Sequence, residues 1–323
     1  MMKRTITALA ATAALAIGST AVAEDEKSCG SIKFGQVNWT GVSAKTETAA
    51  WLLEQMGYET DVTTASVPIM FESLAGDDID AFLGLWLPTQ RSMVKERMIE
   101  GDIDIVAKNL EGAKYTVGVN KAAWDDGVRH FEDLAENIDK FDGEILGIEA
   151  GNDGNEIIKD MIDDDAYGMG DFELKPSSEA GMLTEVNRRI DRDKWVAWLA
   201  WAPHPMNLNI DLKFLEGGAD YWGPNQGGAT VYTQVREGYA WRCENVGQFL
   251  ENYTFTVDEQ SKMAGYVIND DMDYAEAGRK LIEEKPELLD RWFDEGGTYQ
   301  TGAVKTADGE SDAKEAVSEA LDL

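Results

Sequence analysis

The chain has 323 residues, of which 43% are hydrophobic and 9% aromatic, and its 61 acidic against 29 basic side chains give a net charge of −32. Ten Trp, ten Tyr and ten Phe provide enough core material to exclude a disordered chain, and the length leaves room for two domains of roughly 150 residues each. So anionic a surface repels phosphate backbones and anionic headgroups, which argues against nucleic acid and membrane surfaces as partners.

The first 23 residues have the pattern of a secretory signal peptide. Lys3 and Arg4 precede a short apolar run over residues 6–17, and Ala21-Val22-Ala23 forms a small-residue cleavage site. No later stretch reaches about 18 apolar residues, so no transmembrane helix is expected. The sequence therefore predicts export of a soluble mature chain to the periplasm.

The next hundred residues alternate between strand and helix periodicity. Residues 31–37 alternate polar and apolar, which predicts a strand, and apolar residues recur at helical spacing over 49–56. A strand is predicted over 58–64, then a helix that ends near Gly76, then a buried strand over 79–86. This order is typical of parallel strands with helices on both faces.

A second unit of the same kind follows, without a flexible linker. Strands are predicted over 114–119, 144–149 and 195–201, a helix over 156–162, a further strand over 212–215, and helices over 258–268 and 275–284. Two such units predict two lobes joined by strands that cross a hinge.

The two cysteines after the signal peptide are Cys29 and Cys243. In an exported protein an even count favours a disulfide, the alternative being two buried thiols. Closing so long a loop would stabilise the fold by roughly 4–5 kcal/mol in the chain-entropy model.

Motifs for catalysis are missing from the sequence. His130 and His204 are its two histidines, and there is no zinc-protease, serine-hydrolase, phosphate-loop or dinucleotide-binding pattern. We therefore expect neither an enzyme nor a metal site or cofactor.

Three tryptophans stand where predicted strands end. Trp39, Trp86 and Trp201 are each followed within two residues by Gly or Pro. Ligands of open α/β sheets bind outside the carboxyl ends of the strands, so these rings are predicted to meet in one cleft. The alternative for any single Trp is core packing. Ring faces suit a quaternary ammonium, which has no N–H to donate.

Several blocks of sequence carry a family resemblance over nearly the whole mature chain: 38–40, 66–68, 78–84, 112–116, 147–155, 201–207 and 223–231. On these blocks the chain resembles the substrate-binding proteins of glycine betaine/choline ABC importers, and most of all their choline-binding members. The resemblance implies a type II periplasmic-binding-protein fold with two α/β lobes, a two-strand hinge and the ligand cleft between the lobes. Residues 24–113 and 209–323 would form one lobe and 114–208 the other.

The same resemblance implies an aromatic box of Trp39, Trp86, Tyr115 and Trp201. It also places Asn152 on a contact to the ligand hydroxyl, and pairs Cys29 with Cys243 in a disulfide. Weaker candidates for ligand contact are Gly41, Asn155 and His204. For His204 the alternative is a hydrogen bond that supports its loop.

The implied function is a monomeric periplasmic binding protein that delivers glycine betaine or choline to a membrane permease. Choline-binding relatives have an Asp where this chain has Gly41, and loss of that charge predicts that glycine betaine binds at least as well as choline. Two alternatives remain open: a secreted enzyme acting on a choline derivative, and a chemoreceptor-linked sensor of the same ligand.

Overall fold

Over residues 29–293, which the computed structural model describes, nine strands form one curled sheet in the order β2-β1-β3-β9-β4-β7-β5-β6, with β8 paired to β4. The strands are β1 (Ser31–Gln36), β2 (Glu59–Thr64), β3 (Ala81–Leu87), β4 (Ile103–Asn120), β5 (Glu144–Leu146), β6 (Glu173–Lys175), β7 (Ala197–Ala202), β8 (Leu212–Phe214) and β9 (Gly228–Arg236). The predicted signal peptide, residues 1–23, lies outside the described residues.

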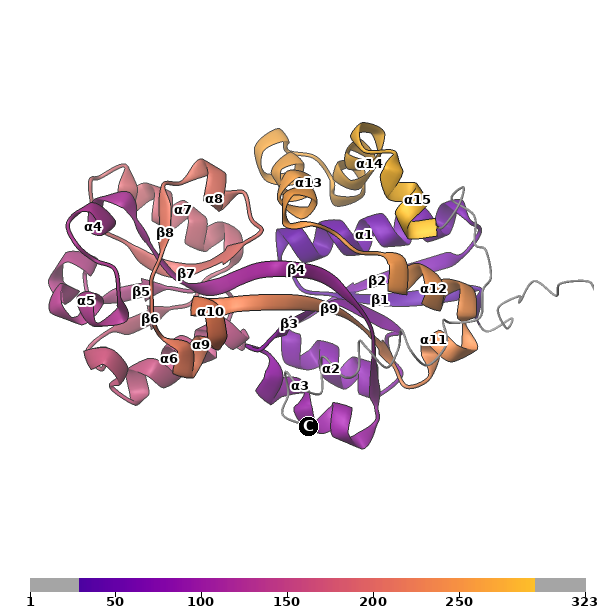
Figure 1. The fold of residues 1–323 in the computed structure, drawn as a ribbon, viewed down its shortest axis with the longest axis horizontal. Helices are drawn as coiled ribbons and strands as arrows, with labels where there is room; N and C mark the ends of the chain where they lie inside the picture. Colours follow the sequence, from indigo (N-terminus) through magenta and orange to yellow (C-terminus); the bar gives the residue numbers. More distant parts are fainter. Residues whose placement is uncertain (1–28, 294–323) are drawn as a thin grey trace, which may run out of the picture.

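Helices cover both faces of this sheet (Figure 1). They are α1 (Thr40–Gln55), α2 (Val67–Ala75), α3 (Arg91–Glu100), α4 (Lys121–Asp125), α5 (Phe131–Glu136), α6 (Asp153–Asp163), α7 (Glu179–Ile190), α8 (Met206–Asn209), α9 (Ala219–Trp222), α10 (Pro224–Gly227), α11 (Tyr239–Arg242), α12 (Glu244–Asn252), α13 (Val257–Asp270), α14 (Tyr274–Glu284) and α15 (Glu287–Phe293), with short 3-10 turns η2 (Ile138–Phe141) and η3 (Ala166–Gly168). Within residues 29–293 no helix is both long and apolar enough to cross a membrane.

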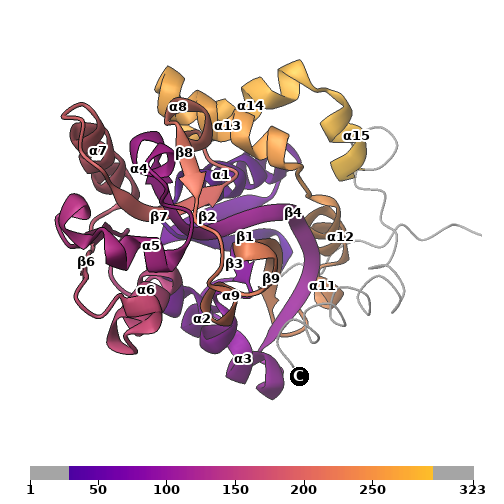
Figure 2. The ribbon, with the colours of Figure 1, turned by 60° about the vertical axis from the view of Figure 1, so that its left-hand side comes forward.

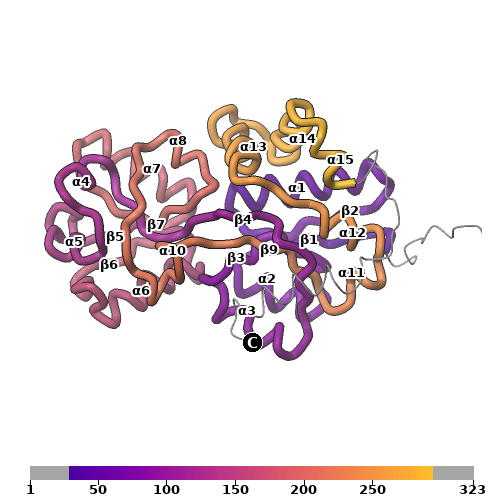
Figure 3. Tube along the Cα trace, viewed as in Figure 1, coloured from indigo at the N-terminus to yellow at the C-terminus, as the bar shows by residue number. Residues whose placement is uncertain are grey.

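The long strands β4 and β9 run side by side through the middle of the protein and join its two halves (Figures 1 and 3). We call the half with β1–β3, α1–α3 and α11–α15 the first lobe, and the half with β5–β8 and α4–α10 the second lobe. β9 pairs with β3 on one side and with β4 on the other. At Lys114 the pairing of β4 with β9 ends and its pairing with β7 begins.

The chain returns to the first lobe later than the sequence predicted. β8 pairs with the end of β4 at Gly118–Asn120, and α9 lies beside α6 in the second lobe (Figure 2). The crossing is therefore made by β9 and does not begin at residue 209. The physical reason is that β8 pairs with backbone groups at the second-lobe end of β4.

Helix α1 begins nine residues before its predicted start, directly after Trp39. Its first turns are polar yet buried, so their apolar periodicity is weak. The Lys45 ammonium is wholly buried and donates to Asn109 Oδ1 of β4 at 2.6 Å, and burial lowers the pKa of Lys45 to about 7. The helix that carries Trp39 is thereby tied to a crossing strand.

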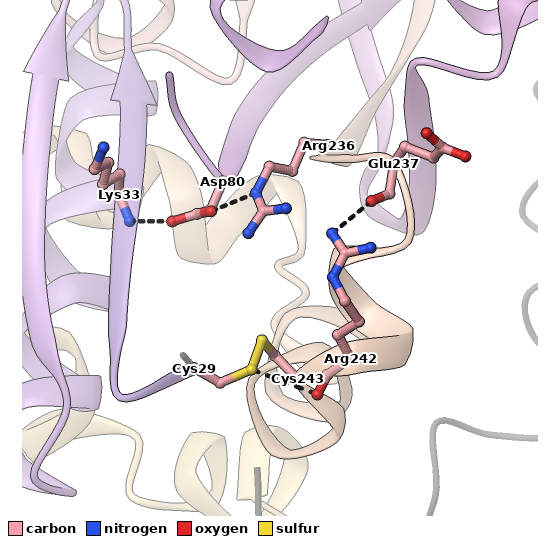
Figure 4. Close-up of a disulfide and its surroundings, with 7 residues drawn as sticks. All are labelled: Cys29, Lys33, Asp80, Arg236, Glu237, Arg242 and Cys243. Atoms are coloured by element: carbon pink, nitrogen blue, oxygen red, sulfur yellow. Dashed lines mark hydrogen bonds and ion pairs between the residues drawn. A yellow bond between two sulfur atoms is a disulfide. The ribbon is translucent and has the colours of Figure 1, made fainter. Parts of the chain in front are cut away.

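The structure contains the disulfide between Cys29 and Cys243, which joins the start of β1 to the turn between α11 and α12 (Figure 4). The two Cα atoms lie 5.4 Å apart and both cysteines are buried. Nearby, Asp80 accepts from the Lys33 backbone N–H at 2.8 Å and from Arg236 Nε at 2.6 Å. These contacts hold β1, β3 and β9 together at the outer end of the first lobe.

Replacing both Cys29 and Cys243 by serine should lower the unfolding free energy by roughly 4–5 kcal/mol, because the unfolded chain regains the freedom of a 214-residue loop. Urea unfolding of the double variant beside the oxidised parent measures the loss. Ligand affinity per folded molecule should stay unchanged, since both ends of the bridge lie in the first lobe. Equal stability of the two proteins would contradict the prediction.

Candidate ligand-binding site

Four aromatic rings meet between the two lobes, and we call them the ring cage: Trp39, Trp86, Tyr115 and Trp201. With Ile148 they line a cavity of about 20 Å³, close to the space of one water molecule. The Trp86 and Tyr115 ring centres are 5.8 Å apart, and those of Tyr115 and Trp201 are 6.2 Å apart. All four side chains belong to residues less than 10% exposed. The predicted box residues are therefore together in space, around one small cavity.

Each ring is positioned by a regular element. Trp39 caps the N-terminus of α1, and Trp86 lies near the end of β3. Tyr115 and Trp201 are direct cross-strand partners in the antiparallel pair β4–β7, so their side chains share one face. Trp198, three positions before Trp201, lies on the opposite face and is fully buried.

Two apolar neighbours complete the cage and were missed by sequence reasoning. Trp222 of α9 is fully buried and packs edge-on against Tyr115 at 5.8 Å, and Ile148 stands in the turn after β5. Ile148 falls within the strand predicted over 144–149, which in the structure ends at Leu146, and Trp222 belongs to no predicted element. The one available signal was that Gly223-Pro224 follows Trp222, as Gly or Pro follows the other cage tryptophans.

Asn152 holds the cage tyrosine in place. Its Oδ1 accepts from the Tyr115 hydroxyl at 3.0 Å and from the Asn155 backbone N–H at 3.1 Å, which caps α6. Its Nδ2 donates to Asp153 Oδ1 at 3.1 Å, and Asn152, which is 1% exposed, is not part of the cavity lining. The Asn155 side chain accepts from the Ile148 backbone N–H and donates to the backbone carbonyls of Ile148 and Glu149. It therefore stabilises the turn and does not face the cavity.

His204 and Gly41 lie beside the cage and not in its lining. The Met206 N–H donates to His204 Nδ1 at 2.9 Å, so in the neutral ring Nε2 carries the proton and faces Glu179 Oε1 at 3.2 Å. A Cβ at position 41 would start 2.8 Å from Gln260 Nε2. His204 therefore supports its loop, and a side chain at position 41 would first meet α13.

The comparisons with known proteins decide the family. Residues 30–284 match the substrate-binding domain of ABC-type glycine betaine transport systems. The chain belongs to this family. Its family identity and type II fold, both predicted from the sequence, are thereby confirmed, and the family is one of transport proteins and not of enzymes.

Members of known structure and sequence agree with this. An ABC-transporter choline binding protein, solved in complex with choline, is 40% identical, with a TM-score of 0.82 over 91% of this chain and 100% of that one. The uncharacterized protein ORF1 of Chromohalobacter salexigens is 43% identical over 157 residues, 49% of this chain and 98% of its own. The glycine betaine/carnitine transport binding protein GbuC of Listeria monocytogenes is 28% identical over 163 residues, 50% of this chain and 52% of its own.

Three second-lobe carboxylates surround the cage of this transport protein. Glu149 Oε1 accepts from Trp39 Nε1 at 2.7 Å, and Asp153 Oδ1 accepts from Gln90 Nε2 at 3.4 Å. Glu179 accepts from the Thr40 backbone N–H at 3.1 Å. All three contacts run from the second lobe to first-lobe donors that carry no charge.

Lysine and arginine side chains do not offset these acids. Within residues 29–293 no Lys or Arg forms an ion pair with Glu149, Asp153 or Glu179, and the cation–π pairs there all involve other rings. Burial raises the pKa of Glu149, and it raises that of Asp153 to about 6. The cage is thus a set of electron-rich faces within a field of negative charge, which is complementary to a cation.

Asp153→Asn should raise the melting temperature of the ligand-free protein by a few degrees at pH 7.5, and by almost nothing near pH 4. Asp153 has a pKa of about 6 in the folded state, above its ordinary value of 3.8, so between these values the folded protein holds the extra proton. Stability from this group therefore falls as the pH rises from about 4 to about 6 and stays lower above that. Calorimetry at both pH values is the measurement. An equal gain at both would contradict the prediction.

Proposed function

We propose that this chain is the periplasmic binding protein of an ABC importer, that it captures a quaternary ammonium cation in the ring cage, and that choline is its preferred ligand. The observation that carries the proposal is the convergence of four aromatic rings, from both lobes and the crossing strands, beside three carboxylates that form no ion pair with Lys or Arg within residues 29–293. Each desolvated cation–π contact contributes roughly 0.5–2 kcal/mol, and the carboxylates add attraction for a net positive charge.

A second argument favours choline over glycine betaine. The N-terminus of α1, next to Trp39, is the natural place for a ligand carboxylate, because its backbone N–H groups lack helical partners. Glu179 already occupies this helix end, through the Thr40 backbone N–H. A betaine carboxylate would have to displace Glu179 or lie among like charges. A choline hydroxyl carries no charge, so it neither displaces Glu179 nor meets repulsion from these carboxylates.

Ligand entry requires the lobes to part. The cage residues are each less than 10% exposed, and Trp39 and Trp201 come from opposite lobes. We propose that the lobes open for the ligand and close on it, and that the permease recognises the closed form. Export to the periplasm through residues 1–23, and action as a monomer, belong to the same proposal.

Calorimetric titration of the mature protein tests the function. Choline, glycine betaine, carnitine and tetramethylammonium form one series, with methylamine as the small, strongly hydrated control. The neutral isostere 3,3-dimethylbutan-1-ol has the shape of choline without its charge. Choline should bind tightly, and both methylamine and the neutral isostere should bind at least about a hundredfold more weakly. Failure of every methylated ammonium ion to bind would overturn the proposal.

The two competing functions, a secreted enzyme and a sensor, can each be distinguished from the proposed one by experiment. A secreted enzyme would release choline from an ester or phosphoester, whereas a binding protein returns its ligand unchanged, as mass spectrometry of incubated ligand will show. A sensor would pass the same ligand to a signalling partner. Deletion of this protein would then abolish chemotaxis toward choline and leave its uptake intact.

A further inference from the structure

A buried carboxylate, Glu179, connects the two lobes outside the cavity lining. It is the first residue of α7 in the second lobe, and the residue is 6% exposed. Across the lobe junction it accepts from both the backbone N–H and the hydroxyl of Thr40, the first residue of α1. Within its own lobe it faces His204 Nε2 at 3.2 Å.

These partners connect Glu179 to two cage rings on opposite lobes. Thr40 directly follows Trp39, whose φ of −109° and ψ of 127° place it at the N-cap of α1. The His204 ring packs edge-on against Trp201, with ring centres 5.0 Å apart. His204 is itself fixed by the Met206 N–H on Nδ1. One carboxylate thus links the backbone beside Trp39 to the side chain beside Trp201.

We propose that Glu179 is a positioning residue for ligand capture, which holds Trp39 and Trp201 in their closed arrangement and so sets the rate of ligand release. The proposal rests on the proposed function. Glu179 does not line the cavity. Its contacts to Thr40 exist only when the lobes meet, so they stabilise the closed state and are missing during ligand encounter. Loss of such contacts therefore changes the dissociation rate and leaves the association rate nearly unchanged.

Three variants test the proposal. Glu179→Gln keeps the volume but sets an amide N–H₂ against a donor, either Thr40 or His204. Thr40→Val removes the hydroxyl donor and keeps Trp39, and it serves if the first variant folds poorly. Glu259→Gln is the matched control, because Glu259 also lies in the first turn of a helix, is 6% exposed and accepts from a threonine backbone N–H, but all its partners lie in the first lobe.

Stopped-flow tryptophan fluorescence with choline supplies the rates. We expect Glu179→Gln to raise the dissociation rate about tenfold or more, with the association rate within about twofold of the parent. Thr40→Val should act in the same direction, and the double variant should be less than additive, because both changes remove one interaction. Glu259→Gln should leave both rates unchanged.

The failures of the two proposals can be told apart. Absence of choline binding to the parent protein would overturn the proposed function, and this inference with it. Normal binding by the parent, with a dissociation rate in Glu179→Gln and Thr40→Val equal to that of the parent, would overturn the role of Glu179 alone. So would a loss confined to the melting temperature of the ligand-free protein, since that is the signature of a merely structural carboxylate.

Discussion

Trp201→Ala should weaken choline binding by a factor of ten or more. Removing the indole takes away one cation–π contact and leaves a gap beside Tyr115, its cross-strand partner. A desolvated contact of this kind contributes up to about 2 kcal/mol, and 1.4 kcal/mol corresponds to tenfold in the dissociation constant. Trp39→Ala and Trp86→Ala should have effects of the same size. Calorimetric titration of the folded variants with choline is the measurement.

Trp51→Ala is the matched control for these variants. Trp51 is half-buried on α1, the same helix that Trp39 caps, and its ring lies below the Arg279 guanidinium at 5.5 Å and not in the cage. Its loss should lower the melting temperature and leave the choline affinity of the folded protein nearly unchanged. Similar losses of affinity in Trp51→Ala and Trp201→Ala would mean that the cage assignment is wrong.

The tryptophans at the strand ends were predictable because the pattern that marks them lies within a few residues of sequence. Trp39, Trp86 and Trp201 each stand before a Gly or Pro where an apolar strand ends, and strands of one sheet end at a common edge. Tyr115 has no such neighbour and was assigned only through the family resemblance. It lies within β4, which the sequence indicated only over residues 114–119.

The rest of β4 was hidden by irregular pairing. Its register with β9 shifts between Ile105 and Ala107, between Lys108 and Leu110, and again before Ala113. Each irregularity interrupts the alternation of inward and outward side chains, which is the signal that predicts a strand. The full crossing of the lobes, and the late return of the chain through β9, were therefore not readable from periodicity.

The acids around the cage were hidden for a different reason. With 61 Asp and Glu in the chain, the position of any one carboxylate carries little information. Glu179 lies 139 residues from Thr40, and only the fold brings the start of α7 against the start of α1. Sequence patterns describe short-range order, whereas this contact depends on how two lobes close.

Choline should bind at least about tenfold more tightly than glycine betaine, contrary to the expectation drawn from Gly41. That expectation treated position 41 as the only source of charge near the polar end of the ligand. In the structure Glu149 and Glu179 place further carboxylates beside the cage, at 2.7 Å from Trp39 Nε1 and at the N-terminus of α1. A single cation gains from both carboxylates, whereas in a zwitterion the attraction and repulsion largely cancel.

Glu149→Gln tests this account directly, because the amide keeps the size of the side chain and an acceptor for Trp39 Nε1 while it removes the charge. Choline affinity should fall about tenfold, and glycine betaine affinity should change much less. The ratio of choline affinity to glycine betaine affinity should therefore fall. Gly41→Asp adds a carboxylate beside Gln260 and should move the ratio the other way. Both ligands are titrated into the three proteins at pH 7.5 and one ionic strength, because screening alters such ratios. A parent protein that binds betaine as tightly as choline, with a ratio that Glu149→Gln does not change, would show that charge at the cage does not set the preference.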